Sequence, residues 1–503
     1  MKIDGSSLTL QQAVQVIYQR EHVEIDEAVL PQIRASRQVI SDCLAQGKPV
    51  YGINTGFGKL ADVRISDEHL DDLQRNLVLS HACGVGRPLF PEAVRAVLLC
   101  KANTLAKGHS GVREQVIRNL LSLLNHNILP IIPEQGSVGA SGDLAPLAHM
   151  SLLLIGEGEA HTAEGVVPAV KALRMAGIEP LKLQAKEGLA LLNGTHFMTG
   201  LGVINWHLGS LLAETADIIG AMSAEALLCT PVAFDDRIHK ARGYRGQRLS
   251  AGRLRKMMAG SPIRESHLGC NRVQDPYSVR CMPQVHGAVC DTLEHIAGIL
   301  SVEINAATDN PLIFIEEKEI LSGGNFHGHP VSTVMDMLGI VVSHLSAMSE
   351  RRVAFMMDSA MSELPPFLVR DSGINSGFMI AQVSAAALAS ENKVLAHPAS
   401  VDSIPTSANK EDFVTMGASA AVKGNRIVMN AAHVLAVELI CACQALEFRA
   451  PLQPGPASRR VLDLVRSVIP TLEKDRRIDG DINTAAELIV SGQVRAAVED
   501  LIT

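Results

Sequence analysis

The chain has 503 residues, of which 47% are hydrophobic and 19% charged, and this balance excludes an intrinsically disordered protein. A chain of this length exceeds a typical single-core domain, so two or more packed units are expected. The net charge of −8 is modest for the size, and no run of Lys or Arg indicates a nucleic-acid or membrane partner.

The nine cysteines are scattered along the chain without a CxxC pair, which argues against a disulfide framework and against a zinc site. The N-terminal segment MKIDGSSLTLQQAVQVI lacks the apolar core of a signal peptide. The most apolar windows, such as MLGIVVSHLSAM, contain polar residues that interrupt them before the length of a membrane span. These features predict a cytoplasmic protein with no membrane segment.

Helical periodicity dominates along the chain. Because only 3% of the residues are aromatic, Leu, Ala, Val, Ile and Met must fill the core, and these residues favour helices over sheets. Helices are predicted, in chain order, over 110–126 with Ser110 as N-cap, over 330–357, over 376–397 and over 419–446. The last three are apolar on most sides, so they require burial in a large bundle or at a subunit interface.

Strands and domain boundaries give weaker signals. Short strands are expected near PLIFIEEKEILSGG, residues 311–324, where two glycines follow a β-branched run. A soft boundary near residue 200 separates a loop-rich N-terminal part, 1–200, from a long-helix part, 201–503. The predicted fold is mainly α.

The stretch GSVGASGDLAPLAHM, residues 136–150, places three glycines within seven positions just before a predicted helix. Its simplest interpretation is a tight turn with Asp143 as N-cap and Pro146 in the first helical turn. A phosphate-binding loop does not fit, because Asp143 stands where the Walker pattern has Lys. A nucleophile elbow does not fit either, because G-x-S-x-G is incomplete around Ser141 and around Ser137.

Another interpretation uses all the small residues of this turn. In a compressed turn the amide nitrogen of Gly142 can attack the carbonyl carbon of Ala140, and loss of two waters, one of them from Ser141, leaves an exocyclic methylene. Glycine supplies an unhindered nitrogen, and a strained turn favours residues with few Cβ atoms. The product is an electrophile made from backbone, which the positive end of a helix dipole would strengthen.

This turn resembles the signature of the aromatic amino acid ammonia-lyases, whose Ala-Ser-Gly cyclises to 4-methylidene-imidazol-5-one. The resemblance spans most of the chain, and it implies a large helical-bundle lyase of the fumarase/aspartase-like type with a loop-rich N-terminal domain. It also implies a prosthetic group formed from Ala140, Ser141 and Gly142 without an external cofactor, and a homotetramer whose sites combine several subunits. Further motifs resemble the family in order: YGINTGFG (51–58), NLVLSHACGVG (76–86), KEGLALLNGT (186–195), VQDPYSVRCMPQVHGA (273–288), DNPL (309–312), GGNFHG (323–328), SGFMIAQV (376–383) and PTSANKED (405–412).

The resemblance implies roles for three residues in catalysis. Tyr277, in QDPYSVR, resembles the active-site tyrosine that is our first choice for removing the β-proton of the substrate. Tyr51, in YGINTG, resembles a second active-site tyrosine and is expected to assist with the amine or the proton. Arg280 follows Tyr277 by three residues, so the two can share a helical face, and its implied role is a bidentate grip on the substrate carboxylate.

Four further positions match family residues around the substrate or the prosthetic group. Asn193 and Gln274 are expected to hydrogen-bond one or the other, Phe326 in GGNFHG to shape formation of the group, and Asp143 to assist the cyclisation. Taken singly, these residues have ordinary interpretations: a turn Asn, an exposed Gln, a core Phe and a helix cap.

Two residues bear on the substrate. His81 matches the position that faces the substrate ring, where phenylalanine-specific members usually carry an aromatic residue and tyrosine-specific members often carry His. Glu411, in NKED, stands where phenylalanine and tyrosine enzymes have an amide, and a carboxylate there can accept an imidazole N–H. The expected reaction is therefore L-histidine to trans-urocanate and ammonia. Alternatively, Glu411 is an acid in the first turn of a helix.

One departure and several alternatives stay open. Histidine-specific members commonly have His after the Glu-Asp pair, whereas this chain has Phe413, which bears on substrate affinity or specificity. The alternatives are a tyrosine or phenylalanine ammonia-lyase, an aminomutase, or a non-catalytic helical assembly protein, although the last predicts degraded motifs. A metal site is not predicted, because His327 and His329 lack an acidic third ligand at regular spacing.

Overall fold

The computed structural model describes residues 1–47, 49–56, 58, 62–270 and 272–502, so position 57 of the first motif lies outside the described residues. The chain forms two compact units. Whereas the sequence suggested two consecutive parts, each unit combines three segments distant in sequence. The first unit comprises Met1–Asn205, Ile296–Asp336 and Pro398–Val422, and the second comprises Trp206–His295, Met337–His397 and Lys423–Thr503.

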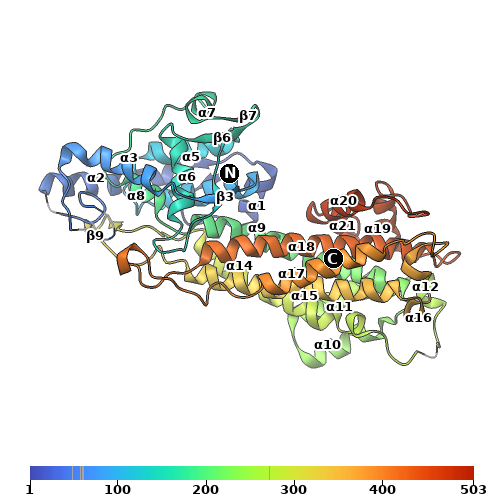
Figure 1. Ribbon diagram of the computed structural model, residues 1–503. Helices are drawn as coiled ribbons and strands as arrows, with labels where there is room; N and C mark the ends of the chain where they lie inside the picture. Colours follow the sequence, from blue (N-terminus) through green and yellow to red (C-terminus); the bar gives the residue numbers. More distant parts are fainter. Residues whose placement is uncertain (48, 57, 59–61, 271, 503) are drawn as a thin grey trace. The chain divides into compact units, whose positions relative to one another are not determined.

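The first unit holds short and medium helices together with small sheets (Figure 1). β1 pairs with β2 in parallel, while β3–β5, β4–β6–β7 and β8–β9 are antiparallel. α4 is buried over almost its whole length, and its buried residues include polar and charged ones such as Arg95, Lys101 and Asn103. The helices and strands of this unit are α1 (Leu10–Gln19), α2 (Leu30–Gln46), α3 (Leu70–His81), α4 (Pro91–Ala106), α5 (Glu114–Asn125), α6 (Leu144–Leu154), α7 (Ala169–Met175), α8 (Glu187–Leu192), β1 (Lys2–Ile3), β2 (Glu24–Ile25), β3 (Val85–Pro88), β4 (Leu129–Pro130), β5 (Pro133–Gln135), β6 (Glu159–Thr162), β7 (Gly165–Pro168), β8 (Leu312–Phe314) and β9 (Glu319–Leu321).

Long helices build the second unit. Four of them, α9 (His196–Ala226), α14 (Met282–Glu303), α15 (His329–Met357) and α18 (Gly417–Glu447), begin in one unit and end in the other. The remaining helices of the second unit are α10 (Asp236–Arg242), α11 (Arg245–Met257), α12 (Pro262–Glu265), α13 (Tyr277–Arg280), α16 (Ser359–Ser362), α17 (Met379–Leu395), α19 (Pro456–Arg466), α20 (Asp479–Val490), α21 (Gln493–Ala496) and α22 (Glu499–Ile502).

Buried polar contacts fix the register between these long helices. Arg352 of α15 forms a bidentate ion pair with Glu438 of α18, at 2.5 and 2.8 Å, and both side chains are fully buried. Asn392 of α17 donates to Ser346 of α15 and to the backbone carbonyl of Ile427 in α18. Such contacts tie the three helices together, because an unpaired polar group at any of these positions would be costly.

The predicted long helices are confirmed as α15, α17 and α18, and the predicted strands as the β8–β9 hairpin. By length and composition alone, α15 and α18 could cross a membrane, contrary to the sequence-based argument about apolar windows. The most apolar window of α18 is 83% buried inside the protein, as in a core helix. Ser110 is not an N-cap, because α5 begins only at Glu114, after an extended Arg113.

Candidate active site

The glycine turn leads into α6 as predicted, with Asp143 at the N-cap position. The Asp143 carboxylate does not cap its own helix. Instead it accepts the backbone N–H of Met198 at 2.9 Å and the hydroxyl of Ser137 at 3.4 Å. Complete burial raises the pKa of Asp143 to about 7. The residue therefore joins the turn to the first turn of α9.

Gly142 and Gly194 lie against each other in a parallel bridge. Gly194 donates its N–H to the carbonyl oxygen of Ser141 at 3.3 Å and accepts the N–H of Asp143 at 2.8 Å. Gly142 has a φ of +75°, and a Cβ there would lie 2.2 Å from the Gly194 oxygen, so no other residue fits. The backbone of Gly194 thus holds both flanks of the residue expected to supply the attacking nitrogen.

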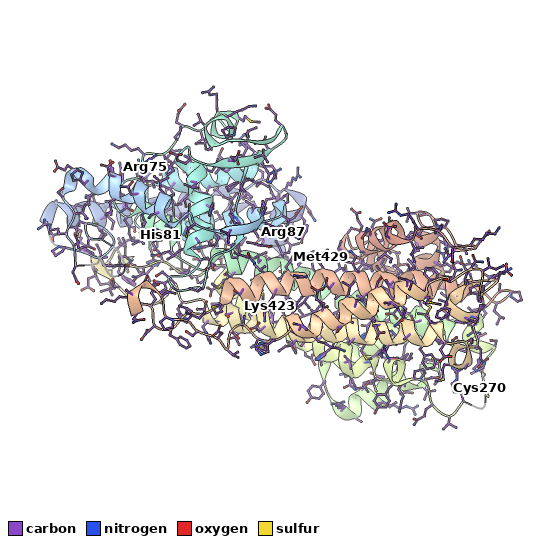
Figure 2. All side chains as sticks on the ribbon, viewed as in Figure 1. Arg75, His81, Arg87, Cys270, Lys423 and Met429 are labelled. Atoms are coloured by element: carbon purple, nitrogen blue, oxygen red, sulfur yellow. The ribbon has the colours of Figure 1, made fainter. Side chains whose placement is uncertain are left out.

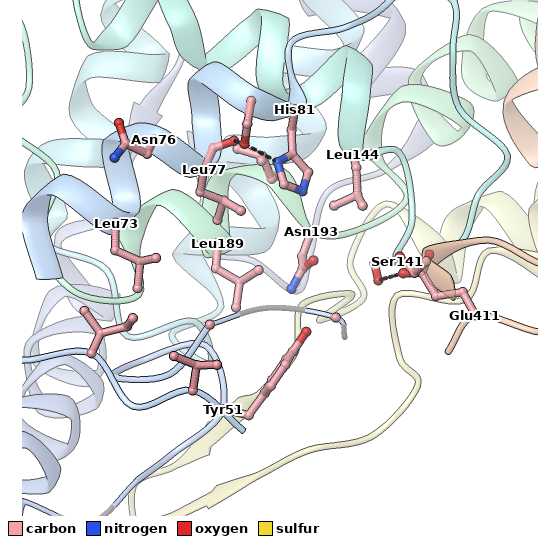
Figure 3. Close-up of a pocket in the computed structure, with 17 residues that line it drawn as sticks. Tyr51, Leu73, Asn76, Leu77, His81, Ser141, Leu144, Leu189, Asn193 and Glu411 are labelled. Atoms are coloured by element: carbon pink, nitrogen blue, oxygen red, sulfur yellow. Dashed lines mark hydrogen bonds between the residues drawn. The ribbon is translucent and has the colours of Figure 1, made fainter. Parts of the chain in front are cut away.

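A pocket of about 570 Å³ opens beside this turn (Figure 3). Its volume suits a small organic molecule. Leucines form much of its wall, and Tyr51, His81, Ser141, Asn193 and Glu411 are its candidate functional residues. All residues that line the pocket belong to the first unit, although they come from segments as distant as Tyr51 and Glu411. Their meeting supports the sequence-based grouping of these five positions.

Glu411 bonds directly to the turn. Its Oε1 accepts the hydroxyl of Ser141 at 3.0 Å, which is drawn as a dashed line in Figure 3, and its Oε2 accepts the hydroxyl of Thr406 at 2.9 Å. The alternative of a helix-capping acid is wrong, because Glu411 lies in the loop before α18 and is bridged to Thr406. The carboxylate therefore lies within hydrogen-bond distance of the turn.

Two other pocket residues are tuned by burial. His81 ends α3 (Figure 2), and burial lowers its pKa, so the neutral imidazole predominates near neutral pH. Its Nδ1 lies 3.1 Å from the hydroxyl of Ser80. Burial raises the pKa of Tyr51, so this side chain stays a neutral phenol over the same pH range. Both residues can thus exchange hydrogen bonds with a ligand without carrying charge.

Asn193 lines the pocket, and its side-chain oxygen is the group that can bond a ligand. Its side-chain NH₂ group donates one hydrogen bond to Asp309 at 3.1 Å and one to the carbonyl of Asn310 at 2.7 Å. Only its side-chain oxygen is left to accept a hydrogen bond from a bound molecule. An amine, which can donate, suits this position better than a carboxylate.

Tyr277, Arg280 and Gln274 belong to the second unit. Tyr277 and Arg280 share the single turn of α13, and the guanidinium carbon lies 4.2 Å from the centre of the tyrosine ring. The Tyr277 side chain is 69% exposed, and Gln274 is exposed as well. The implied roles of these three residues stay predictions.

The roles suggested for Phe326 and Phe413 also stay predictions. Phe326 is half-buried and does not line the pocket. Phe413 is 60% exposed and stacks on the ring of His327 at 6.0 Å, with His329 at a similar distance. Phe413 does not line the pocket either.

Sequence reasoning missed several residues that hold this site. Thr406, which orients Glu411, stands inside the quoted motif PTSANKED, so the motif itself was the available signal. Lys101, Lys186 and Asp309 form a buried cluster bonded to Asn193. Lys186 and Asp309 stand inside the quoted motifs KEGLALLNGT and DNPL, but Lys101 lies in none of them, and no spacing rule links the three residues.

Comparison with known proteins defines the class. A sequence model described as aromatic amino acid lyase matches residues 8–467. This match covers most of the chain, and the chain belongs to the aromatic amino acid lyase family. The family assignment agrees with the mainly α fold and with the glycine turn at the pocket.

Individual relatives narrow the comparison. The chain is 50% identical to a histidine ammonia-lyase of Myxococcus xanthus (strain DK1622) over 497 residues, which cover 99% of this chain and 98% of the relative. The crystal structure of histidine ammonia-lyase from Trypanosoma cruzi is 43% identical, covers 100% of this chain and 95% of that one, and superimposes with a TM-score of 0.92. A tyrosine aminomutase from Streptomyces globisporus is 36% identical over 99% of this chain and 98% of that one, with a TM-score of 0.94.

Proposed function

We propose that the protein is a cytoplasmic histidine ammonia-lyase, which converts L-histidine to trans-urocanate and ammonia. The observation that carries this proposal is the bond between Glu411 and Ser141 in the lining of a pocket that His81 also lines. A carboxylate at this position can accept the N–H of an imidazole, whereas a phenyl ring offers no donor and would leave the carboxylate without that bond. The identity of about 50% to histidine ammonia-lyases agrees with this choice of substrate.

The turn fits a prosthetic group made from Ala140, Ser141 and Gly142. The support is steric: Gly142 is held at a positive φ against Gly194, with no room for a Cβ, while Ser141 presents its hydroxyl to the pocket. When formed, 4-methylidene-imidazol-5-one supplies an electrophilic carbon toward the substrate amine. No external cofactor is part of the proposal.

The side chains of the pocket then have separate tasks. The oxygen of Asn193 accepts from the substrate amine, since its N–H bonds are occupied. Glu411 and the neutral His81 hold the imidazole ring, and the leucines exclude water from it. Tyr51, as a neutral phenol, donates a hydrogen bond or a proton. Removal of the Ser141 hydroxyl would free Oε1 of Glu411 for the ring.

We further propose a homotetramer in which neighbouring copies supply Tyr277 and Arg280 to this pocket. Tyr277 is well exposed on the single chain, as are the apolar residues Ile380, Val383 and Val394 along α17. Exposed large apolar side chains on one helix favour burial against another copy. In that assembly Tyr277 removes the β-proton, Arg280 grips the carboxylate, and Gln274 bonds the substrate.

The experiment that tests the function combines product spectra with an intact mass. The purified protein is incubated separately with L-histidine, L-tyrosine and L-phenylalanine while product absorbance is followed. We expect urocanate from histidine alone and a mass lower than the sequence mass by two waters. Product from tyrosine or phenylalanine would overturn the proposed substrate, and a β-amino acid would indicate an aminomutase. If no product forms and the mass shows no deficit, the proposal that the protein is an ammonia-lyase is wrong.

A variant pair isolates the role of Glu411. Glu411→Gln is expected to lower kcat/KM for histidine about 10- to 100-fold, because a hydrogen bond to a charged group contributes about 1.5–3 kcal/mol. Its exposed neighbour supplies the control, since Asp412→Asn removes an equal charge outside the pocket and should leave kcat/KM unchanged. Equal effects of the two substitutions would contradict the assignment.

A further inference from the structure

Three charged side chains lie fully buried in the first unit and have no task in the reaction described above. Lys101 comes from α4, Lys186 stands at the N-cap of α8, and Asp309 precedes the β8–β9 hairpin. Their exposed fractions are 0–1%. Burying charged groups costs desolvation free energy that their mutual attraction often fails to recover, so stability alone does not account for this cluster.

The contacts of this cluster converge on one residue. Lys101 donates from Nζ to the backbone carbonyl of Asn193 at 2.7 Å. Lys186 pairs with one oxygen of Asp309 at 2.6 Å, and the other oxygen of Asp309 accepts from the Asn193 side chain at 3.1 Å. Asn193 is thus fixed at its backbone by one lysine and at its side chain by the ion pair.

Asn193 leads directly into the residue that holds the glycine turn. The carbonyl bonded by Lys101 belongs to the same planar peptide unit as the N–H of Gly194. That N–H donates to the oxygen of Ser141, and the Gly194 oxygen accepts from Asp143. Rotation of this peptide would break the bond from the Gly194 N–H to the Ser141 oxygen, on the N-terminal side of Gly142, so a constraint on the Asn193 carbonyl is also a constraint on the turn.

Lys101 can donate to the Asn193 carbonyl in either of its protonation states. Burial lowers the pKa of Lys101 to about 7, while Asp309 and Asp143 favour its charged form and Lys186 opposes it. The amine and the ammonium can both donate to a carbonyl, so this contact persists on either side of neutrality. Although burial would raise the pKa of Asp309, the two lysines hold it below its ordinary value.

We propose that Lys101 and the Lys186–Asp309 pair are positioning residues for ring closure in the Ala140–Ser141–Gly142 turn. They fix Asn193, and through Gly194 they hold the turn in the compressed form that brings the Gly142 nitrogen to the Ala140 carbonyl carbon. This inference rests on the proposed function, because it requires that the turn cyclises.

The ring closure balances without an added reagent. A bond forms between the nitrogen of Gly142 and the carbonyl carbon of Ala140. The Ala140 oxygen leaves as water with the protons of the Gly142 and Ser141 amide nitrogens. The Ser141 hydroxyl leaves as a second water with the α-hydrogen of Ser141. Nothing is oxidised or reduced, and the mass of the chain falls by two waters.

The test measures the cyclised fraction by intact mass on the purified full-length chain. Lys101→Met removes the donor to Asn193 and is expected to lower the fraction that has lost two waters at least fivefold. Lys101→Gln keeps a donor and should recover much of that fraction. Lys107→Met is the matched control, because Lys107 follows the same helix and also donates to a backbone carbonyl, that of Asn305 at 2.8 Å, but lies outside the cluster.

Thermal unfolding and size-exclusion profiles of each variant show that it is folded. A folded Lys101→Met chain with the full mass deficit would overturn the proposal, as would equal losses in Lys107→Met. A purely structural role would lower the unfolding temperature without changing the mass. If the wild-type chain itself shows no deficit, the proposed function fails instead, so the two failures are distinguishable.

A second variant keeps the test decisive if Lys101→Met does not fold. Lys186→Met combined with Asp309→Leu removes both charges of the pair together, and the remaining Lys101, whose pKa burial lowers to about 7, can stay neutral and still donate to Asn193. We expect this double variant to fold and to show a reduced cyclised fraction, since the Asn193 side chain loses one of its two acceptors. A full mass deficit in the folded double variant would overturn the proposal.

Discussion

At the scale of the residue, Asp143 has the position that the sequence predicts, but its carboxylate has a different hydrogen-bond partner. It stands at the N-cap position of α6, as its sequence predicts, but its carboxylate reaches Met198 in the first turn of α9. Any residue with a short polar side chain would satisfy the local rule. The bond from the Met198 N–H gives this buried acid a structural role, because the carboxyl joins two segments that meet at the turn.

The raised pKa of Asp143 predicts a pH-dependent stability. Because burial raises this pKa from 3.8 to about 7, the folded protein binds the proton more tightly than the unfolded chain does. The contribution of the carboxyl to stability is therefore complete below about pH 4 and is lost as the pH rises through about 7. Relative to the Asp143→Asn chain, the chain with Asp143 should lose about 1.4 kcal/mol of its free energy of unfolding per pH unit between pH 5 and 7.

The measurement compares unfolding curves of the two side chains at several pH values. Both are studied in a Ser141→Ala background, so that neither chain can lose the Ser141 hydroxyl and the comparison concerns the carboxyl alone. A difference that levels off above about pH 8 supports the raised pKa. Parallel stability profiles from pH 5 to 8 would contradict it.

At the scale of the element, the long helices depend on buried charge as well as on apolar packing. Arg352 and Glu438 join α15 to α18, and Ser223 of α9 also donates to Glu438, at 2.7 Å. The ion pair therefore links three helices at one point of the second unit. The desolvation cost of a buried ion pair is offset by the attraction between its partners only while both are present.

Removal of one partner should be far more damaging than removal of both. Arg352→Met leaves Glu438 charged and buried, so we expect a loss of about 3–5 kcal/mol in the free energy of unfolding. Arg352→Met combined with Glu438→Leu should recover most of that loss. A surface pair gives the control: Arg460, 48% exposed, pairs with Asp500, 63% exposed, so Arg460→Met should cost less than about 1 kcal/mol.

Denaturant unfolding at one fixed protein concentration measures these differences, since any self-association contributes to the apparent stability. Equal losses for the single and the double variant would show that packing, rather than the unpaired charge, dominates at this position.

At the scale of the whole molecule, the pocket of the single chain holds only part of the predicted site. Tyr51, His81, Ser141, Asn193 and Glu411 line or meet at it. The predicted base and the predicted carboxylate grip lie in the second unit. The proposed homotetramer accounts for this division, because a second copy can bring an exposed α13 to the pocket of the first.

Complementation between two inactive variants tests this arrangement. Ser141→Ala and Tyr277→Phe chains, each expected to be inactive alone, are co-expressed and purified as mixed assemblies. If Tyr277 serves a neighbouring pocket, about a quarter of the sites in a random mixture combine two intact residues, and a similar share of wild-type activity returns. If both residues serve a site within one chain, the mixture stays inactive.

Patterns within the sequence are enough to predict the mainly α fold, the long apolar helices, the glycine turn and the family. These features are local or lie in contiguous motifs, and hydrophobic periodicity and turn chemistry act over a few residues. The sequence also groups Tyr51, His81, Asn193 and Glu411 through the resemblance, although nothing local connects them.

Which atoms meet depends on how distant segments pack together. Glu411 was compatible with a helix cap or with a pocket acid, and its bond to Ser141, 270 positions away, separated the two. The Lys101–Asn193–Asp309 contacts were invisible for the same reason, because hydrogen bonds between distant segments follow from how the helices pack and not from spacing along the chain. Packing selects a single partner for each buried polar group, since every group left unpaired costs free energy.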